Sequence, residues 1–549
     1  MADLRARSPI QLITALRNWL TQTLEPQPHQ DVRGFWLLVA AIVGLGALLR
    51  FWDLNGTSLW MDEASTLGLA RLPLHVIAFN NIDNHPPLSF VIQHVWQLLV
   101  PDSAYARVPA AAIGTVTLVV IILMLKDIVG QRAAIFCGLL FAVSTSHVYF
   151  SQEARMYAPL VLGLCLAIWG SLGHARAGGQ GGYVYWSLYL VGGCIAIYSQ
   201  ILALVGMGLI AAAECASAFF AQGRLAYLRG WFLRNALLGI LALPWLLSIP
   251  SATETFPGIF ADHGFREFLW MYGNVSGFPG LGNIGPIVKL FELSLYIACA
   301  GGIAAAWSDG RRALSLTLGA LVLVYPLSVF AIDFLRPIIS NRVLLPVVIG
   351  VTVAAGYLLS RISSRRIGAS AIGTLGLTGL FSTAVELRHH IKPEDYRAAF
   401  AIAAAEGFSL APVITCLDFG AAAAHETNAS ARILYHRYGE TMLYPGPEYW
   451  HAASQSMKVF RASSATEIDA YLGGGLLFKG GLSEALAGDK IAAFIRLPCE
   501  ESVEKRISEE LALAGFNSVK DVRVLGRSAD FVIFETPSTQ LSLYVRRED

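Results

Sequence analysis

Long apolar runs separated by short polar loops dominate this sequence. A bilayer core about 30 Å thick is crossed by about 20 apolar residues of helix. The 549 residues are 55% hydrophobic and 14% charged, whereas a soluble protein is about a quarter charged. We therefore predict a polytopic α-helical membrane protein with about eleven spans, at 34–51, 106–125, 133–150, 157–174, 183–198, 201–221, 234–250, 287–307, 313–332, 343–360 and 367–385.

A twelfth apolar stretch, 86–100, is short, begins with two prolines and contains polar residues. We interpret it as a helix that lies at the membrane surface. If it stays outside and the N-terminus is cytoplasmic, every inner loop is basic, as the positive-inside rule requires. These loops carry Lys126 and Arg132; His174 and Arg176; Arg224, Arg229 and Arg234; Arg311 and Arg312; and Arg361, Arg365 and Arg366. If 86–100 spanned instead, the basic clusters would alternate sides.

Three regions follow from this topology. Residues 1–33 lack the apolar core and cleavage site of a signal peptide, and their spread arginines predict a cytoplasmic amphipathic helix. Residues 34–390 form the membrane domain, and 391–549 a soluble α/β domain on the outer side. In that domain KPEDYRAAFAIAAAEG and SVEKRISEELALAGF have helical spacing, whereas APVITCLDFG, DKIAAFIRLP, NSVKDVRVLG and ADFVIFETP are typical of strands.

The cysteines argue against a zinc or redox motif, because no CxxC pair occurs. Five of them lie in apolar spans, where we interpret them as small core side chains: Cys137, Cys165, Cys194, Cys215 and Cys299. Cys416 and Cys499 fall in the outer domain. They either form a disulfide or stay free, since sequence does not give their distance.

Acids and arginines gather at the predicted outer face, which indicates a site there. Asp62 and Glu63 follow the first span in the run LWMDEAS. One interpretation is helix capping, since acids are favoured in a first helical turn. The other is a general base, because a carboxylate within hydrogen-bonding reach of a hydroxyl can accept its proton.

The next outer loop, SQEARMY, contains Glu153, Arg155 and Tyr157. These side chains form either a local ion pair with an aromatic anchor or a phosphate site. In the second case Arg155 binds phosphate through its forked donors and Glu153 orients it. Further phosphate or substrate candidates are Arg107, Arg336 and Arg342. His85, in DNHPPLSF, is either a ligand or a structural histidine.

The motifs LW-x-DEA, HPPL, YARVPAA and QEARMY occur here in that order. Together they resemble the bacterial branch of the C-type (GT-C) glycosyltransferase superfamily. This branch includes protein O-mannosyltransferase-like, lipid A aminoarabinose transferase-like and rhizobial galacturonosyltransferase-like enzymes. The resemblance extends over roughly residues 34–400.

The resemblance implies a GT-C fold with interfacial juxtamembrane helices and a donor of the undecaprenyl-phosphate-sugar type. It also implies inversion at the anomeric carbon and Asp62 as catalytic base, with Glu63 beside it. By motif, His85, Arg107, Glu153 and Arg155 correspond to family positions. The late run NRVLLP supplies Arg342 but has Val343 where the family has Tyr, which puts the role of Arg342 in doubt.

The hypothesis is therefore a bacterial inner-membrane glycosyltransferase of the cell envelope. Its acceptor is a hydroxyl of lipid A core, another polyprenyl glycan, a cell-wall polysaccharide or a protein. The sequence requires no cofactor, although Asp62, Glu63 and His85 could hold one divalent cation if they converge. The net charge of +1 suggests no nucleic-acid partner. The alternatives are a flippase or transporter of lipid-linked glycans and a sensor or assembly protein.

Overall fold

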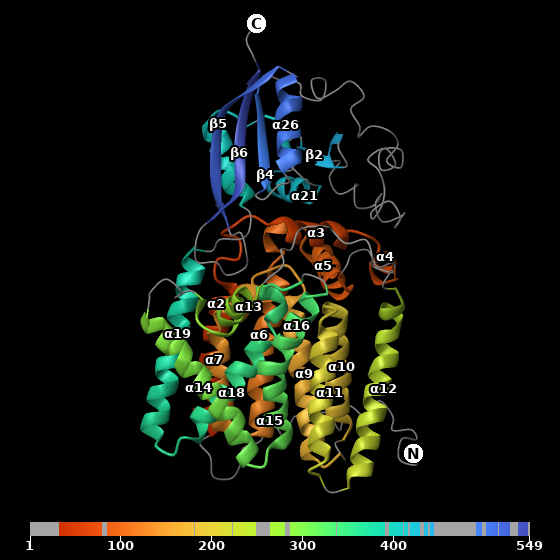
Figure 1. Cartoon of the computed structure of the whole chain (residues 1–549), viewed down its shortest axis with the longest axis vertical. Coiled ribbons are helices and arrows are strands. Elements are labelled where there is room, and N and C mark those ends of the chain that lie inside the picture. The colour runs from red at the N-terminus through yellow and green to blue at the C-terminus, as the bar shows by residue number, and fades with distance from the viewer. Residues whose placement is uncertain are drawn as a thin grey trace.

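The computed structural model describes most of the membrane part and the larger part of the C-terminal region. The described residues are 32–79, 85–179, 182–221, 223–248, 264–279, 286–335, 338–389, 395–409, 411–415, 418–428, 433–437, 440–443, 490–496, 501–513, 515–526 and 536–546. The helix predicted within 1–33 lies outside them, apart from its last two residues. Figure 1 shows a helical bundle at one end of the molecule and a β-sheet at the other.

Helices form the bundle wherever an apolar run was predicted to span. In the described part of the chain, seven are long and apolar enough to cross a membrane. They correspond to α2 (Val32–Phe51), α6 (Val108–Ile128), α9 (Tyr157–Arg176), α12 (Arg224–Ser248), α14 (Pro286–Ser308), the continuous α15–η4–α16 (Arg312–Gly319, Ala320–Val324, Tyr325–Asp333) and α19 (Arg365–His389). An eighth is bent by 63° between α7 (Gln131–Ala142) and α8 (Thr145–Ser151).

The three other predicted spans are shorter helices within the same bundle (Figure 1). They are α10 (Tyr183–Ser199), α11 (Ala203–Ala218) and α18 (Val347–Arg361), of 17, 16 and 15 residues. Small residues let α9 and α10 approach closely, as is typical between membrane helices. A Cβ on Gly163 would lie 2.5 Å from the backbone nitrogen of Ala196. The prediction of a polytopic helical membrane protein is confirmed.

The predicted inner-loop residues Arg224, Arg229 and Arg234 lie within α12, which begins at Arg224. Of these, Arg234 is fully buried rather than exposed in a basic loop. It pairs with the equally buried Glu214 of α11, which also accepts a hydrogen bond from Ser171 at 2.7 Å. The predicted inner loop was wrong here because the first part of α12 is polar in sequence and is therefore typical of a loop. Attraction between the two buried charges offsets part of the desolvation penalty that each of them carries.

Short helices lie between the bundle and the sheet: α3 (Met61–Ala70), α4 (Leu74–Phe79) and α5 (Leu88–Leu99) (Figure 1). At 12 residues, α5 is too short to cross a 30 Å core. Its polar side chains bond carbonyls of neighbouring segments. Gln93 donates to Ala106 at 2.8 Å and Gln97 to Leu67 at 3.2 Å. These contacts fasten α5 beneath α3 and explain the polar residues in an apolar stretch. A fourth short helix, α13 (Phe265–Ser276), packs against α8 and α17 (Asn341–Leu344).

The C-terminal region contains a six-stranded sheet in the order β3-β2-β1-β4-β6-β5. Its strands are β1 (Val413–Thr415), β2 (Ile433–Arg437), β3 (Glu440–Leu443), β4 (Lys490–Arg496), β5 (Phe516–Gly526) and β6 (Thr536–Arg546). Strand β1 runs parallel to β2 and β4, and the other pairs are antiparallel. The described helices of this region are α20 (Tyr396–Ala405), α21 (Asp418–Thr427) and α26 (Glu501–Leu513).

The expected α/β character of this region is confirmed, with differences in detail. Strands β1, β4 and β5 and helices α20 and α26 lie where the sequence predicts them. Strands β2, β3 and β6 were not predicted, and α21 begins within the run APVITCLDFG that was interpreted as a strand. Most of ADFVIFETP lies outside the described residues. Cys416 and Cys499 also lie outside them, whereas the five cysteines of the apolar helices are free. The boundary at residue 391 stays a prediction.

Arg50 stabilises the break between α7 and α8. Its guanidinium is fully buried and donates to the carbonyls of Ala142 at 3.2 Å and Phe141 at 3.3 Å. It also bonds Nδ1 of His147 at 2.8 Å. A bend frees helical carbonyls, which need donors in a dry interior. Arg50 supplies them from α2, so the bend is tied to the first helix of the bundle.

We expect Arg50→Ala to destabilise the protein by roughly 2 kcal/mol or more, because buried carbonyls and His147 lose their donor. The midpoint of thermal unfolding in detergent should fall. Arg33→Ala, at the exposed opposite end of α2, is the matched control and should leave the midpoint unchanged. Equal midpoints for both variants would contradict this role of Arg50.

Candidate active site

Helix α3 presents its two acids in different directions. Trp60 occupies the N-cap position, and Asp62 and Glu63 fall in the first turn. Successive helical residues are about 100° apart around the axis, so neighbours do not share a face. Glu63 is fully buried, whereas the side chain of Asp62 is 25% exposed. Of the two acids, Asp62 is therefore the one that an incoming substrate can reach.

Glu63 forms a bidentate ion pair with Arg107. The Nε of Arg107 donates to Oε1 at 2.8 Å and Nη2 donates to Oε2 at 2.7 Å. The backbone N–H of Ala154 also donates to Oε1, at 2.9 Å. The predicted capping contact is present as well, from the backbone N–H of Trp60 at 3.4 Å. Glu63 thus joins α3 to the start of α6 and to the link between α8 and α9.

Arg107 also holds the loop that leads into α3. It donates to the carbonyls of Leu54 at 2.8 Å, Thr57 at 3.2 Å and Ser58 at 2.9 Å. The guanidinium is almost completely buried, at 2% exposure. Its donors are therefore committed to protein acceptors. This arrangement supports a structural contact with α3 and disfavours the predicted contact of Arg107 with a phosphate.

Asp62 lies between two arginines that come from distant parts of the chain. Its Oδ2 is 2.9 Å from Nη1 of Arg342, which belongs to α17. It is 3.7 Å from Nη2 of Arg155. Arg155 also donates to the carbonyl of Asp62 at 3.1 Å. Asp62 and the buried Glu153 balance the two arginines in formal charge. The arginines therefore suit an anionic ligand through their forked N–H donors rather than through an excess of positive charge.

Aromatic and hydroxyl groups fix the orientation of these arginines. Arg342 donates to the hydroxyl of Tyr157 at 3.3 Å and stands 5.4 Å from the ring centre of Trp60. Arg155 donates to Thr66 at 2.7 Å. Thr66 was not predicted as a site residue. Its position four residues after Asp62, on the same helix face, is the signal that could have identified it.

The remaining predicted residues lie around this cluster. Glu153 is buried just before Ala154, at the link that Glu63 binds. His85 is half-buried and lies three residues before α5. Arg336 lies outside the described residues. No three His, Cys, Asp or Glu side chains of the described segments are grouped as metal ligands, so Asp62, Glu63 and His85 do not converge on a cation.

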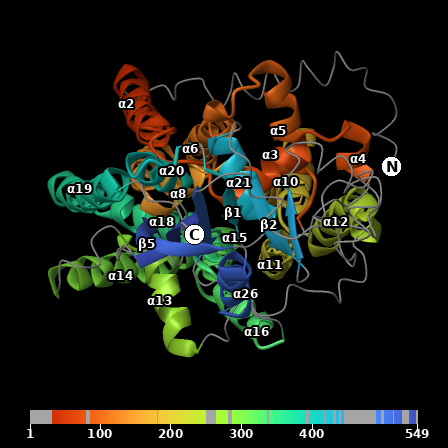
Figure 2. The same ribbon diagram turned by 90° about the horizontal axis from the view of Figure 1, so that it is seen from above.

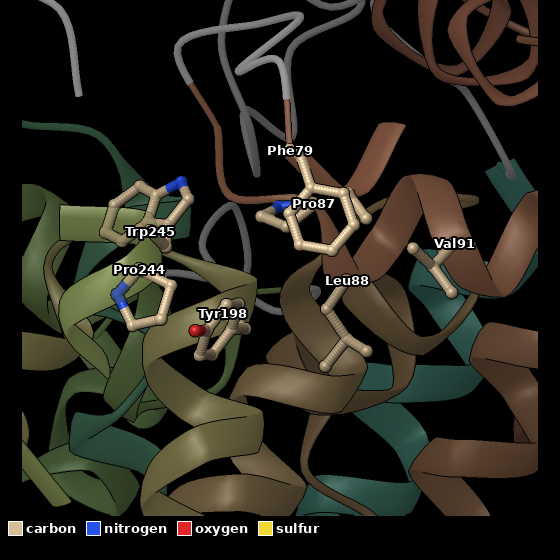
Figure 3. A pocket seen from close by; sticks show the side chains of 8 residues that line it. Phe79, Pro87, Leu88, Val91, Tyr198, Pro244 and Trp245 are labelled. Atoms are coloured by element: carbon tan, nitrogen blue, oxygen red, sulfur yellow. The ribbon is translucent and has the colours of Figure 1, made fainter. Parts of the chain in front are cut away.

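An apolar cavity of about 260 Å³ lies next to the HPPL motif. Figure 3 shows Phe79 and Pro87 on one side and Pro244 and Trp245 of α12 on the other. The full lining is Ala78, Phe79, Pro87, Leu88, Val91, Tyr198, Pro244 and Trp245. Because these side chains carry no formal charge, the cavity suits a hydrocarbon group rather than a charged headgroup.

Comparison with known proteins gives one family match and a shared fold. Residues 84–246 match the family described as dolichyl-phosphate-mannose-protein mannosyltransferase. This segment contains the HPPL motif, Arg107, Glu153, Arg155 and the cavity residues of α10 and α12. No curated protein matches the chain by sequence at a significant level.

Two crystal structures of ArnT from Cupriavidus metallidurans resemble the whole molecule. The apo structure gives a TM-score of 0.54 at 14% identity, and the structure bound to undecaprenyl phosphate gives 0.53 at 13%. Each comparison covers 92% of this chain and 97% of the other. Such low identity shows the fold. Residues 84–246 therefore resemble the mannosyltransferase family, and the molecule shares the fold of these two structures.

Proposed function

We propose that this protein transfers a sugar from a polyprenyl-phosphate donor to an acceptor hydroxyl, with inversion at the anomeric carbon. The observation that carries the proposal is the accessible carboxylate of Asp62 between Arg342 and Arg155. The family match is named for a dolichyl-phosphate sugar, and one of the similar structures holds undecaprenyl phosphate. Both describe a polyprenyl-phosphate ligand, whose phosphate the arginines can recognise.

In this proposal Asp62 accepts the proton of the acceptor hydroxyl while the oxygen attacks the anomeric carbon. The bond between that carbon and the lipid phosphate breaks, and Arg342 and Arg155 stabilise the negative charge that develops on the phosphate. Arg342 pairs with Asp62 in the unliganded molecule. A bound phosphate would draw Arg342 toward itself and leave Oδ2 of Asp62 available for the proton.

Glu63 and Arg107 act in this proposal as the support of α3 rather than as reacting groups. Their buried pair has no solvent-accessible carboxylate oxygen to offer an acceptor, because Glu63 is 0% exposed. Glu153 and Tyr157 flank the arginines. We infer that Tyr157 keeps Arg342 over the donor phosphate through its hydroxyl.

The donor chain would lie in the apolar cavity beside the HPPL motif. The cavity is bounded by surface helices α4 and α5 and by the ends of α10 and α12. In this proposal the cavity lies at the level where a lipid headgroup joins its hydrocarbon chain. The basic inner loops support a cytoplasmic N-terminus and an external site, as in a bacterial inner-membrane enzyme.

The transporter alternative predicts charged residues in a water-filled path at mid-depth. The described helices contain the buried pair of Glu214 and Arg234, but these charges are bound to each other between α11 and α12. The accessible pair of Asp62 and Arg342 lies at one end of the bundle rather than at mid-depth. This distribution favours chemistry at that surface.

We expect Asp62→Asn to lower kcat by about 10²- to 10⁴-fold, because the amide cannot accept the hydroxyl proton. Release of polyprenyl phosphate from a labelled donor measures turnover. Asp521→Asn, at an exposed position of β5, is the matched control. Retained binding of undecaprenyl phosphate by the Asp62 variant would separate lost chemistry from lost structure. Near-normal turnover of the Asp62→Asn variant would contradict the assignment of Asp62 as the general base.

Arg342→Ala should weaken the affinity for undecaprenyl phosphate by about ten- to hundredfold, which corresponds to one charge-assisted contact of about 1.5–3 kcal/mol. Titration of purified protein with the lipid measures the change. Arg361→Ala removes an exposed arginine at the other end of the bundle, where it pairs with Asp309. Equal affinities for the two variants would exclude Arg342 from the phosphate site.

Val91→Trp should fill the cavity and raise the KM of a long-chain donor by roughly tenfold, while a donor with a short prenyl chain keeps its KM. Leu98→Trp, on the exposed face of the same helix (73% exposed), is the control for added bulk. If the KM of both donors rises equally, the cavity does not hold the donor chain.

A further inference from the structure

The C-terminal region contacts both ends of the segment that carries Asp62. Seen from above in Figure 2, α21 lies over α3, and Figure 1 shows the same pair in contact from the side. Arg71, the C-cap residue of α3, forms an ion pair with Glu426 of α21 at 2.6 Å. The Glu426 side chain is only 8% exposed, so this pair is better shielded from water than an ordinary surface pair.

The entrance to α3 is held in the same way by α20. Ser58, in the loop before α3, donates to Asp395 at 3.3 Å. Arg397 donates to the carbonyl of Asn55 at 2.6 Å and to its side-chain oxygen at 3.0 Å. Asp395 also caps α20 by accepting from the backbone N–H of Ala398. The orientation of α20 is therefore coupled directly to the loop that Arg107 binds from the membrane side.

His425, the residue before Glu426, does not replace Arg71 as the cationic partner of Glu426. Burial lowers the pKa of His425, and Arg71 lowers it further, although Glu426 acts in the opposite direction. His425 is therefore mainly neutral at neutral pH. Arg71 is left as the cation of the pair, and it lies nine residues after Asp62 in the same helix.

We propose that α20 and α21 of the C-terminal region position α3, and with it Asp62, over the arginine cluster. Glu426 and Asp395 are then positioning residues, which act through α3. This inference rests on the proposed function of Asp62. A displacement of about 1 Å at a reacting group can cost about 10²-fold in rate, so contacts at both ends of a ten-residue helix can control turnover from outside the site.

The test replaces Glu426 by Ala and measures kcat, the donor KM and thermal stability of the full chain. We expect kcat to fall about tenfold, with an unchanged donor KM and an unfolding midpoint close to that of the parent. The charge-reversed pair Arg71→Glu with Glu426→Arg should recover most of the lost kcat, whereas Arg71→Glu alone should not. Lys505→Ala, which removes the exposed Lys505–Glu509 pair of α26, is the control.

The outcomes separate the two proposals. If Asp62→Asn is inactive but Glu426→Ala keeps the parental kcat, the positioning role is wrong and the proposed function stands. If Asp62→Asn is active, the proposed role of Asp62 as base fails, and the positioning inference that rests on it fails as well. If Glu426→Ala loses stability and kcat together and charge reversal does not restore kcat, the contact is merely structural and the inference is overturned.

Discussion

The buried ion pair of Glu63 and Arg107 is the contact on which the geometry of the candidate site depends. It joins the loop before α3, the first turn of α3, the start of α6 and the link between α8 and α9. Removing one partner of such a pair leaves an uncompensated buried charge, at a cost of about 3–5 kcal/mol. The pair satisfies its own charges, so it fixes these segments without adding net charge to the site.

This arrangement explains why two adjacent acids have different surroundings. Rotation along the helix turns Glu63 inward when Asp62 faces the arginines. The inward acid is then used to anchor the helix, and its neighbour remains accessible beside Arg342 and Arg155. The capping and catalytic interpretations of the acidic motif are therefore compatible, because each applies to a different residue. Glu63 makes the capping contact, and Asp62 is the acid proposed for catalysis.

Sequence alone predicted much of the fold because a bilayer imposes length and composition on each span. It placed helices at all eleven apolar runs and identified α5 as too short to cross. It misplaced Arg234 and overlooked Glu214, because a hydropathy run cannot show that two charges on different helices neutralise each other. Strand β6 was missed because its sequence, TPSTQLSLYVR, is polar over its first half.

The sequence identified most residues of the candidate site but not how they pair with one another. Its outer-face arginines and acids follow from the topology, but pairing between Glu63 and Arg107, 44 positions apart, requires the fold. The same holds for Arg342, which reaches Asp62 from 280 positions away. Val343 stands where the family has Tyr, which put the role of the adjacent Arg342 in doubt. In the structure Val343 contributes through its backbone, because its carbonyl accepts a hydrogen bond from the hydroxyl of Tyr325 at 2.8 Å. That backbone contact helps to place α17 whatever the side chain at 343.

The position of the site between two parts of the molecule limits how substrates can reach it. The bundle side supplies Arg155, Tyr157 and Arg342, and the C-terminal region covers α3 from the opposite side (Figure 1). A lipid-linked donor can approach along the apolar cavity at the membrane level. In the proposed function a hydroxyl acceptor, which is polar, gains nothing from that apolar path. The contacts that we propose to orient Asp62 lie on the side of α3 that faces the C-terminal region.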